Sequence, residues 1–188
     1  MAIYETGMGG HYDATNVVER PAVTGITSLG IDHTFVLGET IEQIAWHKAG
    51  IQKEGVRSFT VRQGESAMGI IERRAKEKGV LSLEVVDVDR RLEDVEIKPD
   101  ADFQRGNASL AIRLAETVLQ KIDPAFKVDK GRLPKEFRDG LEKVVWRGRC
   151  EKKVEGNVSW YLDGAHTKDS IAVAAKWFGD EAAKRLLS

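Results

Sequence analysis

The chain has a single cysteine, Cys150, no long apolar run and almost no net charge. One cysteine excludes an internal disulfide framework and makes a reducing compartment the default. No apolar run approaches the roughly 18 residues that span a bilayer, and the first residues carry no basic segment followed by an apolar one, so neither membrane insertion nor a signal peptide is expected. A net charge of −1 gives no electrostatic footprint for nucleic acid.

What the sequence does contain is an ordinary globular composition with alternating strand and helix patterns. With 41% hydrophobic and 31% charged residues in 188, one or at most two domains are expected, and intrinsic disorder is excluded as the main description. Short apolar runs predict strands at 2–4, 22–28, 57–61 and 81–86. Helical patterns lie between and after them, at 41–49, 67–78 and 108–121. This alternation predicts an α/β fold with a mainly parallel sheet.

Local signals mark the ends of the predicted helices. Thr40 and Gln43 have the spacing of a capping box, and Gly50 can end that helix with a positive φ. Ser66 and Gly79 are the predicted cap and stop of the second helix, and Asn107 is the predicted N-cap of the third. No element is predicted for 90–102.

A domain boundary is predicted near residue 140. Asp123-Pro124 and the run from Gly131 to Pro134 are breakers, and a new pattern begins near Leu141. One strand at 158–162 and one helix at 169–187 follow. Because one strand and one helix cannot bury both faces of a sheet, residues 141–188 are expected to be an incomplete domain. A strand at residue 2 would also need neighbours, so the chain is expected to be a fragment.

Two loops that follow predicted strands offer metal-ligand chemistry. The first runs Glu5-Thr-Gly-Met-Gly-Gly10-His-Tyr-Asp13-Ala14-Thr-Asn16, and its glycines let backbone amides approach an anion. The second carries Asp32 and His33. Ligands bind at the carboxyl ends of parallel strands, so Glu5 and His33 could share a divalent cation. The alternatives are an ordinary glycine turn and a histidine bonded to a loop carbonyl.

Three further stretches carry polar residues near predicted helix and strand ends. Lys48 could face a phosphate, or simply favour the dipole at a helix C-terminus. Arg149 precedes the last strand, and Asp163 and His166 follow it, so the three could converge on a nucleotide phosphate or ribose. A salt-bridged surface arginine and a βα turn are the plainer alternatives.

Together these stretches resemble the folylpolyglutamate synthase family of Mur-ligase-like, ATP-dependent amide ligases. The matching motifs are Glu-x-Gly-x-Gly-Gly-x-x-Asp-Ala-Thr-Asn, Ile-Thr-Ser-Leu-Gly-x-Asp-His-x-x-x-Leu-Gly-x-Thr, Ile-Ala-x-x-Lys-Ala-Gly-Ile, Asn-Ala-Ser-Leu-Ala and Tyr-Leu-Asp-Gly-Ala-His. They occur in the family's order from Ile3 to Ser170. The resemblance implies a partial Mur-ligase-like central domain at 1–140, followed by the first strand and helix of a Rossmann-like, glutamate-ligase domain at 141–188.

The resemblance also implies a reaction. MgATP phosphorylates the γ-carboxylate of the terminal glutamate of a tetrahydrofolate, and the amine of an incoming L-glutamate attacks the acyl phosphate to form an amide. The site residues implied by the matching motifs are Glu5 and His33 for Mg²⁺, a catalytic Lys48 that is often carbamylated in this family, Asn107, Arg149 and Asp163 for ATP, a catalytic His166 that closes on the nucleotide with Asp163, and Asp13 and Ala14 near the folate.

Three departures from the family pattern matter. The chain contains no Gly-Lys dipeptide, so the P-loop that cradles the ATP phosphates is missing from it. Arg147 and Lys168 stand where the family usually has proline, which removes two rigid turns near Arg149 and His166. The 188 residues alone are therefore expected to be catalytically inactive.

The sequence leaves three other interpretations open. The chain could belong to a dihydrofolate synthase, it could be a non-catalytic fragment that binds folate or nucleotide, or it could be a metal-dependent hydrolase built on Glu5, His33 and a carbamylated Lys48. For the leading interpretation, a monomer in the cytosol and/or mitochondrion is expected, with no nucleic-acid partner.

Overall fold

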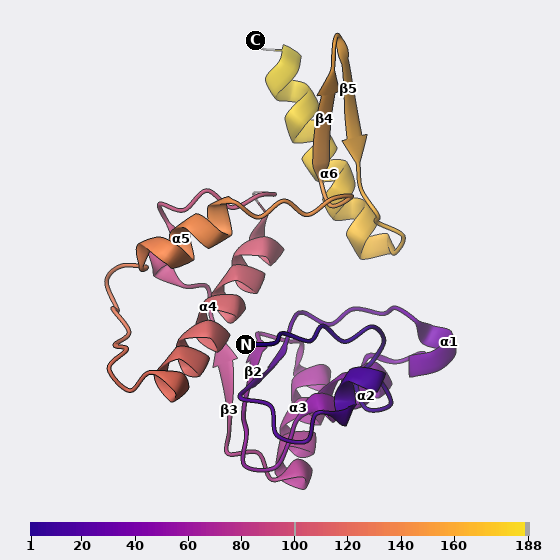
Figure 1. The fold of residues 1–188 in the computed structure, drawn as a ribbon. Coiled ribbons are helices and arrows are strands. Elements are labelled where there is room, and N and C mark those ends of the chain that lie inside the picture. Colours follow the sequence, from indigo (N-terminus) through magenta and orange to yellow (C-terminus); the bar gives the residue numbers. More distant parts are fainter. Residues whose placement is uncertain (100, 187–188) are drawn as a thin grey trace.

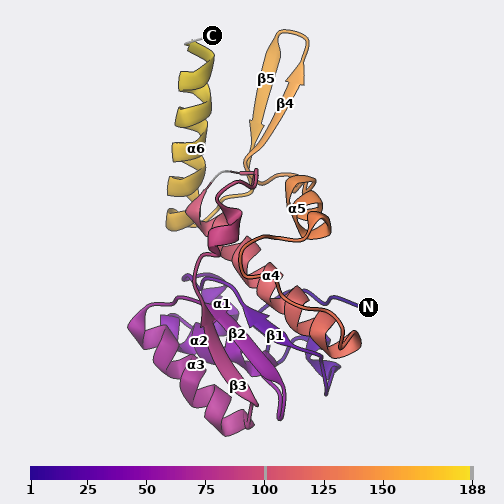
Figure 2. The same cartoon turned by 90° about the vertical axis from the view of Figure 1, so that its left-hand side faces the viewer.

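The computed structural model describes residues 1–99 and 101–186. Its centre is a parallel sheet in the order β1 (Thr24–Ile26), β2 (Arg57–Val61) and β3 (Ser82–Val86). Helices α2 (Ile41–Lys48) and α3 (Glu65–Lys78) cover one face, and α4 (Asp102–Ile122) crosses the other (Figures 1 and 2). The predicted α/β class and parallel sheet are confirmed, and the strand predicted at 57–61 coincides with β2.

Strand β2 is buried on both faces, as expected for the middle of a covered parallel sheet. Phe59 and Val61 point toward α4, where they pack with Leu110. The alternate positions, Ser58 and Thr60, lie on the face toward α2 and α3 and are fully buried. Because side chains alternate along a strand, this one run of residues contributes to both layers.

A second cluster fills the face beneath α2 and α3. Its buried members are small or branched residues from β1 and the two helices, namely Ile26, Ala45, Ala49, Ala67 and Ile71. The alanines let α2 and α3 approach each other closely over the sheet. The end of α2, where Lys48 lies, is thereby fixed against the core.

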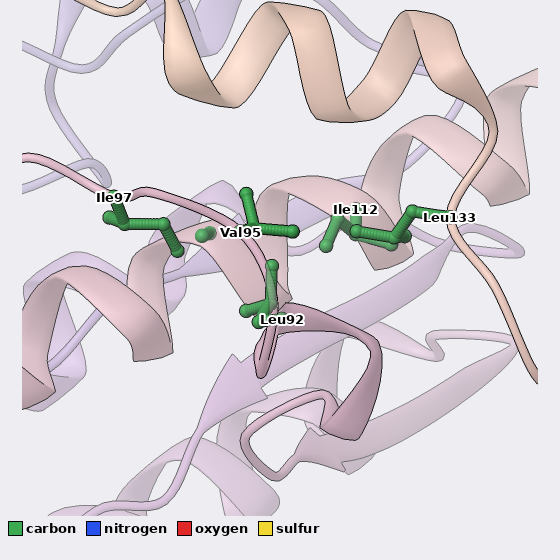
Figure 3. Packing of buried hydrophobic residues seen from close by; sticks show 6 residues of the cluster. Leu92, Val95, Ile97, Ile112 and Leu133 are labelled. Atoms are coloured by element: carbon green, nitrogen blue, oxygen red, sulfur yellow. The ribbon is translucent and has the colours of Figure 1, made fainter.

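A third cluster lies beside α4 and away from the sheet (Figure 3). It joins Leu92, Val95 and Ile97 to Ile112 of α4 and to Leu133. Helix α5 (Lys135–Glu142), which was not predicted, packs on it through Phe137 and Leu141. The segment 90–102, for which no element was predicted, thus supplies core residues and a short 3-10 turn at Arg90–Leu92.

Helix α2 has the predicted start but a different end. The Thr40 hydroxyl accepts the Gln43 N–H, and the Gln43 side chain accepts the Thr40 N–H, which confirms the capping box. The prediction for Gly50 was wrong, because Gly50 does not have a positive φ. The chain continues from α2 into a 3-10 turn at Ala49–Ile51.

Two other helix starts differ from the prediction. Gly64, not Ser66, is the N-cap of α3, although Gly79 ends that helix at a φ of 65° as predicted. Helix α4 begins at Asp102 with Ala101 as its cap, so Asn107 lies inside the helix and is not its N-cap.

The predicted strand at 2–4 does not form. No strand is assigned to residues 2–4, and Ile3 and Tyr4 are 85% and 65% exposed. An apolar run becomes a strand only when a neighbouring edge completes its hydrogen-bond ladder, and among the described residues β1 pairs with β2 alone. Short helical turns follow at Ala14–Val17 and, as α1, at Thr34–Leu37.

The last part of the described chain is a hairpin and a helix, not one strand and one helix. Strand β4 (Glu151–Glu155) pairs antiparallel with β5 (Val158–Leu162), and α6 (Lys168–Leu186) runs beside them (Figure 1). Tyr161 packs edge-on against Trp177 and Phe178 of α6. Residue 187 of the predicted helix lies outside the described residues, and the predicted boundary after residue 140 falls within α5.

Within the described residues, no helix combines the length and apolar character needed to cross a membrane.

Candidate functional site

The glycine-rich loop that follows Glu5 is organised by the carboxylate of Asp13. Its Oδ2 accepts the N–H groups of Gly7 and Met8 at 3.1 and 3.0 Å. Its Oδ1 accepts the Thr15 hydroxyl and N–H at 2.6 and 2.9 Å. The Thr15 hydroxyl, followed by these backbone N–H groups, lowers the pKa of Asp13 to about 2. The carboxylate therefore stays ionised and closes the loop on itself.

The same loop packs tightly on the end of α2. The His11 N–H donates to the carbonyl of His47 at 2.9 Å. Gly10 lies so close to Lys48 that a Cβ there would be 3.0 Å from the Lys48 carbonyl oxygen, and a Cβ on Gly50 would be 2.5 Å from the Cα of His11. Glycine is needed at these motif positions because two backbone segments touch.

His11 also joins this loop to α3 through a buried arginine. The guanidinium of Arg74 lies 4.3 Å from the centre of the Trp46 ring and 3.3 Å from Nδ1 of His11. Burial, and then the positive charge of Arg74, lower the pKa of His11. A neutral imidazole whose Nδ1 accepts a hydrogen bond from an Arg74 N–H fits these contacts. His11 is therefore a link between the loop, α2 and α3.

The loop after β1 meets the loop after β5 at Asp32. Oδ1 of Asp32 accepts the His33 N–H at 2.7 Å, and its Oδ2 lies 3.7 Å from Nε2 of His33 and 3.4 Å from Nε2 of His166. Burial opposes ionisation, but the His33 N–H and the two imidazoles lower the pKa of Asp32 overall. His33 has a φ of 52°, a conformation uncommon outside glycine and frequent at functional sites.

Arg149, Asp163 and His166 lie at the base of the hairpin, and their predicted convergence on a nucleotide phosphate or ribose stays a prediction. Asp163 accepts the N–H of Cys150 and that of Ala165, each at 2.7 Å. Gly164 donates its N–H to the Gly148 carbonyl at 2.8 Å and lies against the guanidinium of Arg149. These hydrogen bonds join the turn before β4 to the turn after β5.

His166 is held at both ring nitrogens. Nδ1 lies 2.9 Å from the carbonyl oxygen of Gly164, and Nε2 faces Asp32. The Gly164 carbonyl and the negative charge of Asp32 raise the pKa of His166. An imidazolium that donates at both nitrogens fits this arrangement.

Glu5 and Lys48 stand apart from these contacts. Glu5 is exposed in a segment without a strand. The prediction that Glu5 lies at the carboxyl end of a strand was therefore wrong. Lys48 is the last residue of α2 and half-buried. Among the described residues, no group of three or more histidine, cysteine, aspartate or glutamate side chains could hold a metal ion.

Two further residues have implied ligand roles, Asn107 toward ATP and Ala14 toward folate. The Asn107 amide donates to Oε1 of Gln104 at 3.2 Å within α4. Ala14 is exposed at the start of the 3-10 turn that Asp13 caps. Their predicted roles toward ATP and folate remain predictions.

Sequence reasoning missed the contact between Asp32 and His166. Both residues lie in recognised motifs, but nothing in their local spacing says that the two loops meet. They meet only in the folded chain, where Nε2 of His166 lies 3.4 Å from Oδ2 of Asp32.

The chain is similar to curated folylpolyglutamate synthases over nearly its whole length. It is 60% identical to that of Neurospora crassa over 98% of this chain and 35% of the relative. It is 44% identical to that of Saccharomyces cerevisiae (strain FostersO) over 95% of this chain and 33% of the relative. The chain thus spans about a third of the length of these relatives. No protein-family model matches it.

Solved structures give the same result for the fold. A complex of folylpolyglutamate synthase with AMPPCP and folate superposes with a TM-score of 0.77 at 29% identity, covering 93% of this chain and 46% of that one. The apo form of the L. casei enzyme gives 0.76 at 29% identity, with the same coverage. By sequence and by fold, the chain is related along almost its whole length to a segment of folylpolyglutamate synthases.

Proposed function

We propose that this chain is part of a folylpolyglutamate synthase, an ATP-dependent ligase that adds L-glutamate to the γ-carboxylate of tetrahydrofolate. The observation that carries the proposal is the 60% identity over 98% of the chain, which includes all five motifs. The AMPPCP and folate complex of a structural neighbour supports ATP and folate as ligands. The proposal includes a monomer that works in the cytosol and/or mitochondrion.

The proposed reaction has two transfers. An oxygen of the folate γ-carboxylate attacks the terminal phosphorus of ATP, the bond to ADP breaks, and an acyl phosphate forms. The amine nitrogen of L-glutamate then attacks the acyl carbon, phosphate leaves with the bonding electron pair, and the nitrogen loses a proton. Both steps build negative charge on oxygen in the transition state. Fixed positive groups near those oxygens therefore stabilise both transition states.

The base of the hairpin supplies such groups. Arg149 offers a guanidinium whose fork matches phosphate oxygens, and Asp163 holds the turn that presents it by accepting the Cys150 N–H. His166, whose pKa is raised, lies beside Asp32 and offers a second positive group when its imidazole is protonated. Asn107 on α4 is proposed to contact the nucleotide, and Asp13 and Ala14 the folate.

The described side chains do not form a complete metal site. Glu5 and His33 are retained as proposed Mg²⁺ ligands, because Mg²⁺ is often bound through one or two protein groups together with phosphates and waters. Among the described residues, no third histidine, cysteine, aspartate or glutamate forms a cluster that would complete such a site. Lys48, with or without a carbamate, likewise has only a proposed role.

A chimera tests the proposal. The matching segment of the Neurospora crassa enzyme is replaced by these 188 residues, and ATP- and glutamate-dependent elongation of tetrahydrofolate is measured. We expect turnover within about tenfold of the parent, because the segments are 60% identical. A folded chimera without turnover would contradict the proposal, and preference for dihydropteroate would identify a dihydrofolate synthase instead.

The isolated chain provides the second measurement. We propose that it has no ligase turnover, because its sequence has no Gly-Lys dipeptide of the P-loop type. Clear turnover by the purified chain would overturn this part of the proposal. Calorimetric titration with AMPPCP then shows whether nucleotide affinity survives without catalysis.

A further inference from the structure

Gln63 lies just beyond the end of β2, and its side chain reaches across to the loop after β1. Its Oε1 accepts the N–H of Leu29 at 3.0 Å, and its Nε2 donates to the carbonyl of Thr27 at 2.8 Å. The same Nε2 lies 3.0 Å from the hydroxyl of Thr60 in β2. One half-buried carboxamide therefore joins the ends of two neighbouring strands.

These contacts demand a carboxamide in one orientation. A backbone N–H needs an acceptor and a backbone carbonyl needs a donor, and only an amide side chain offers both at this spacing. Glutamate has the same shape but would place a carboxylate oxygen against the carbonyl of Thr27. The geometry thus distinguishes glutamine from its closest isostere.

The loop held by Gln63 has little other hydrogen-bond support. In the described part of the chain, no backbone-to-backbone hydrogen bond outside helices and strands involves residues 28–32. The Leu29 side chain packs partly on the cluster beneath α2 and α3. Asp32 and His33 follow within four positions, where Asp32 faces His166.

We propose that Gln63 is a positioning residue that fixes the loop carrying Asp32 and His33, and so sets where these residues stand relative to the loop after β5. Gln63 itself touches no reacting group. Its importance for catalysis rests on the function proposed above, whereas its effect on the loop can be measured without turnover.

Amide hydrogen exchange of the purified chain tests the loop directly. Glutamine 63 is replaced by glutamate (Q63E) and, separately, by methionine (Q63M), which keeps the bulk without polar groups. We expect the amides of Leu29 and His33, which donate to the side chains of Gln63 and Asp32, to exchange about tenfold faster in both variants, while amides of β2 and α4 keep their protection. In Q63M, which removes its acceptor, the Leu29 amide should change most.

The neighbouring variant R62Q is the matched control. Arg62 is exposed and pairs with Asp87 at 2.9 Å, so its loss removes an ion pair from the same turn without touching the loop. If Q63E and Q63M exchange like R62Q, the proposal is wrong. Faster exchange across the whole sheet, with a lower melting temperature, would also overturn it, because Gln63 would then be a general stability residue.

The chimera adds the functional measurement. In a chimera that is active with the unaltered segment, Q63E should lower kcat/KM by about tenfold at an unchanged melting temperature, and R62Q should not. An unchanged kcat/KM in Q63E would refute the link to catalysis. If the unaltered chimera is inactive, the proposed function fails, whereas the exchange result still decides whether Gln63 fixes the loop.

Discussion

At the scale of single residues, the close approach of His11 and Gly50 makes a sharp stability prediction. G50A should lower the free energy of unfolding by about 1–3 kcal/mol, because the new Cβ would be 2.5 Å from the Cα of His11 and backbone must move. Urea denaturation measures this change.

Gly69, inside α3, is the matched control for that variant. A Cβ there would meet nothing within 4 Å, so G69A should raise the free energy of unfolding by about 0.5–1 kcal/mol through helix propensity. Equal effects of G50A and G69A would contradict the packing role of Gly50.

Asp13 gives a prediction in pH. Its pKa falls from an ordinary 3.8 to about 2 in the folded chain, so its stabilising contribution is full above the unfolded pKa and is lost as the pH falls through the folded one. Urea unfolding between pH 5 and about 2 should therefore show a steeper acid loss in the unaltered chain than in D13N. D94N, which alters an exposed aspartate, should retain that loss.

The residue types at the candidate site were readable from the sequence, but their contacts were not. The motif residues Asp163 and His166 follow a strand visible as an apolar run, so their common loop was predictable. The pairing of His166 with Asp32 depends on how two distant segments pack. Gln63 belongs to none of the quoted motifs, and only its hydrogen bonds identify it.

At the scale of elements, helix α2 depends on its capping box. T40A removes the hydroxyl that accepts the Gln43 N–H and should cost about 1 kcal/mol, which lowers the melting temperature by about 2–4 °C in a chain of this size. T40S keeps an accepting hydroxyl and should melt within about 1 °C of the unaltered chain. Thermal melts followed by circular dichroism separate the two, and an equal loss in T40S would argue against the cap.

Elements with a buried face were predicted best. Strand β2 is a continuous run of residues that are buried between two helical layers, and its predicted bounds were correct. Strand β4 reads Glu-Lys-Lys-Val-Glu and is mostly exposed, so no apolar pattern revealed the hairpin. The start of α4 was placed six residues late because Asn107 has the chemistry of a cap but lies within the helix.

At the scale of the whole molecule, the pair of Asp32 and His166 connects the loop after β1 to the loop after β5. The raised pKa of His166 means that its contribution is full below the unfolded value of 6.5 and is lost as the pH rises through the folded pKa. In D32N, the pKa of His166 measured by NMR should be lower than in the unaltered chain, because the negative charge of Asp32 and its hydrogen bond both raise that pKa. An unchanged titration in D32N, or an equal shift in D94N, would exclude the contact.

The overall class of the fold followed from alternating strand and helix patterns, and its assembly did not. Helix α4 contributes Leu110 to the cluster with Phe59 and Ile112 to the cluster with Leu133. One helix therefore packs in two hydrophobic clusters. The helical pattern predicted at 108–121 did not show that Ile112 would pack against the segment 90–102 and α5.

Strand β1 has a consequence for handling the protein. Among the described residues it pairs with β2 alone, so its other edge has no strand partner. Such an edge is a template for strands from other molecules. Concentrated solutions of the purified chain should therefore aggregate by edge-to-edge pairing of β1. A lysine introduced on this strand should reduce the aggregation.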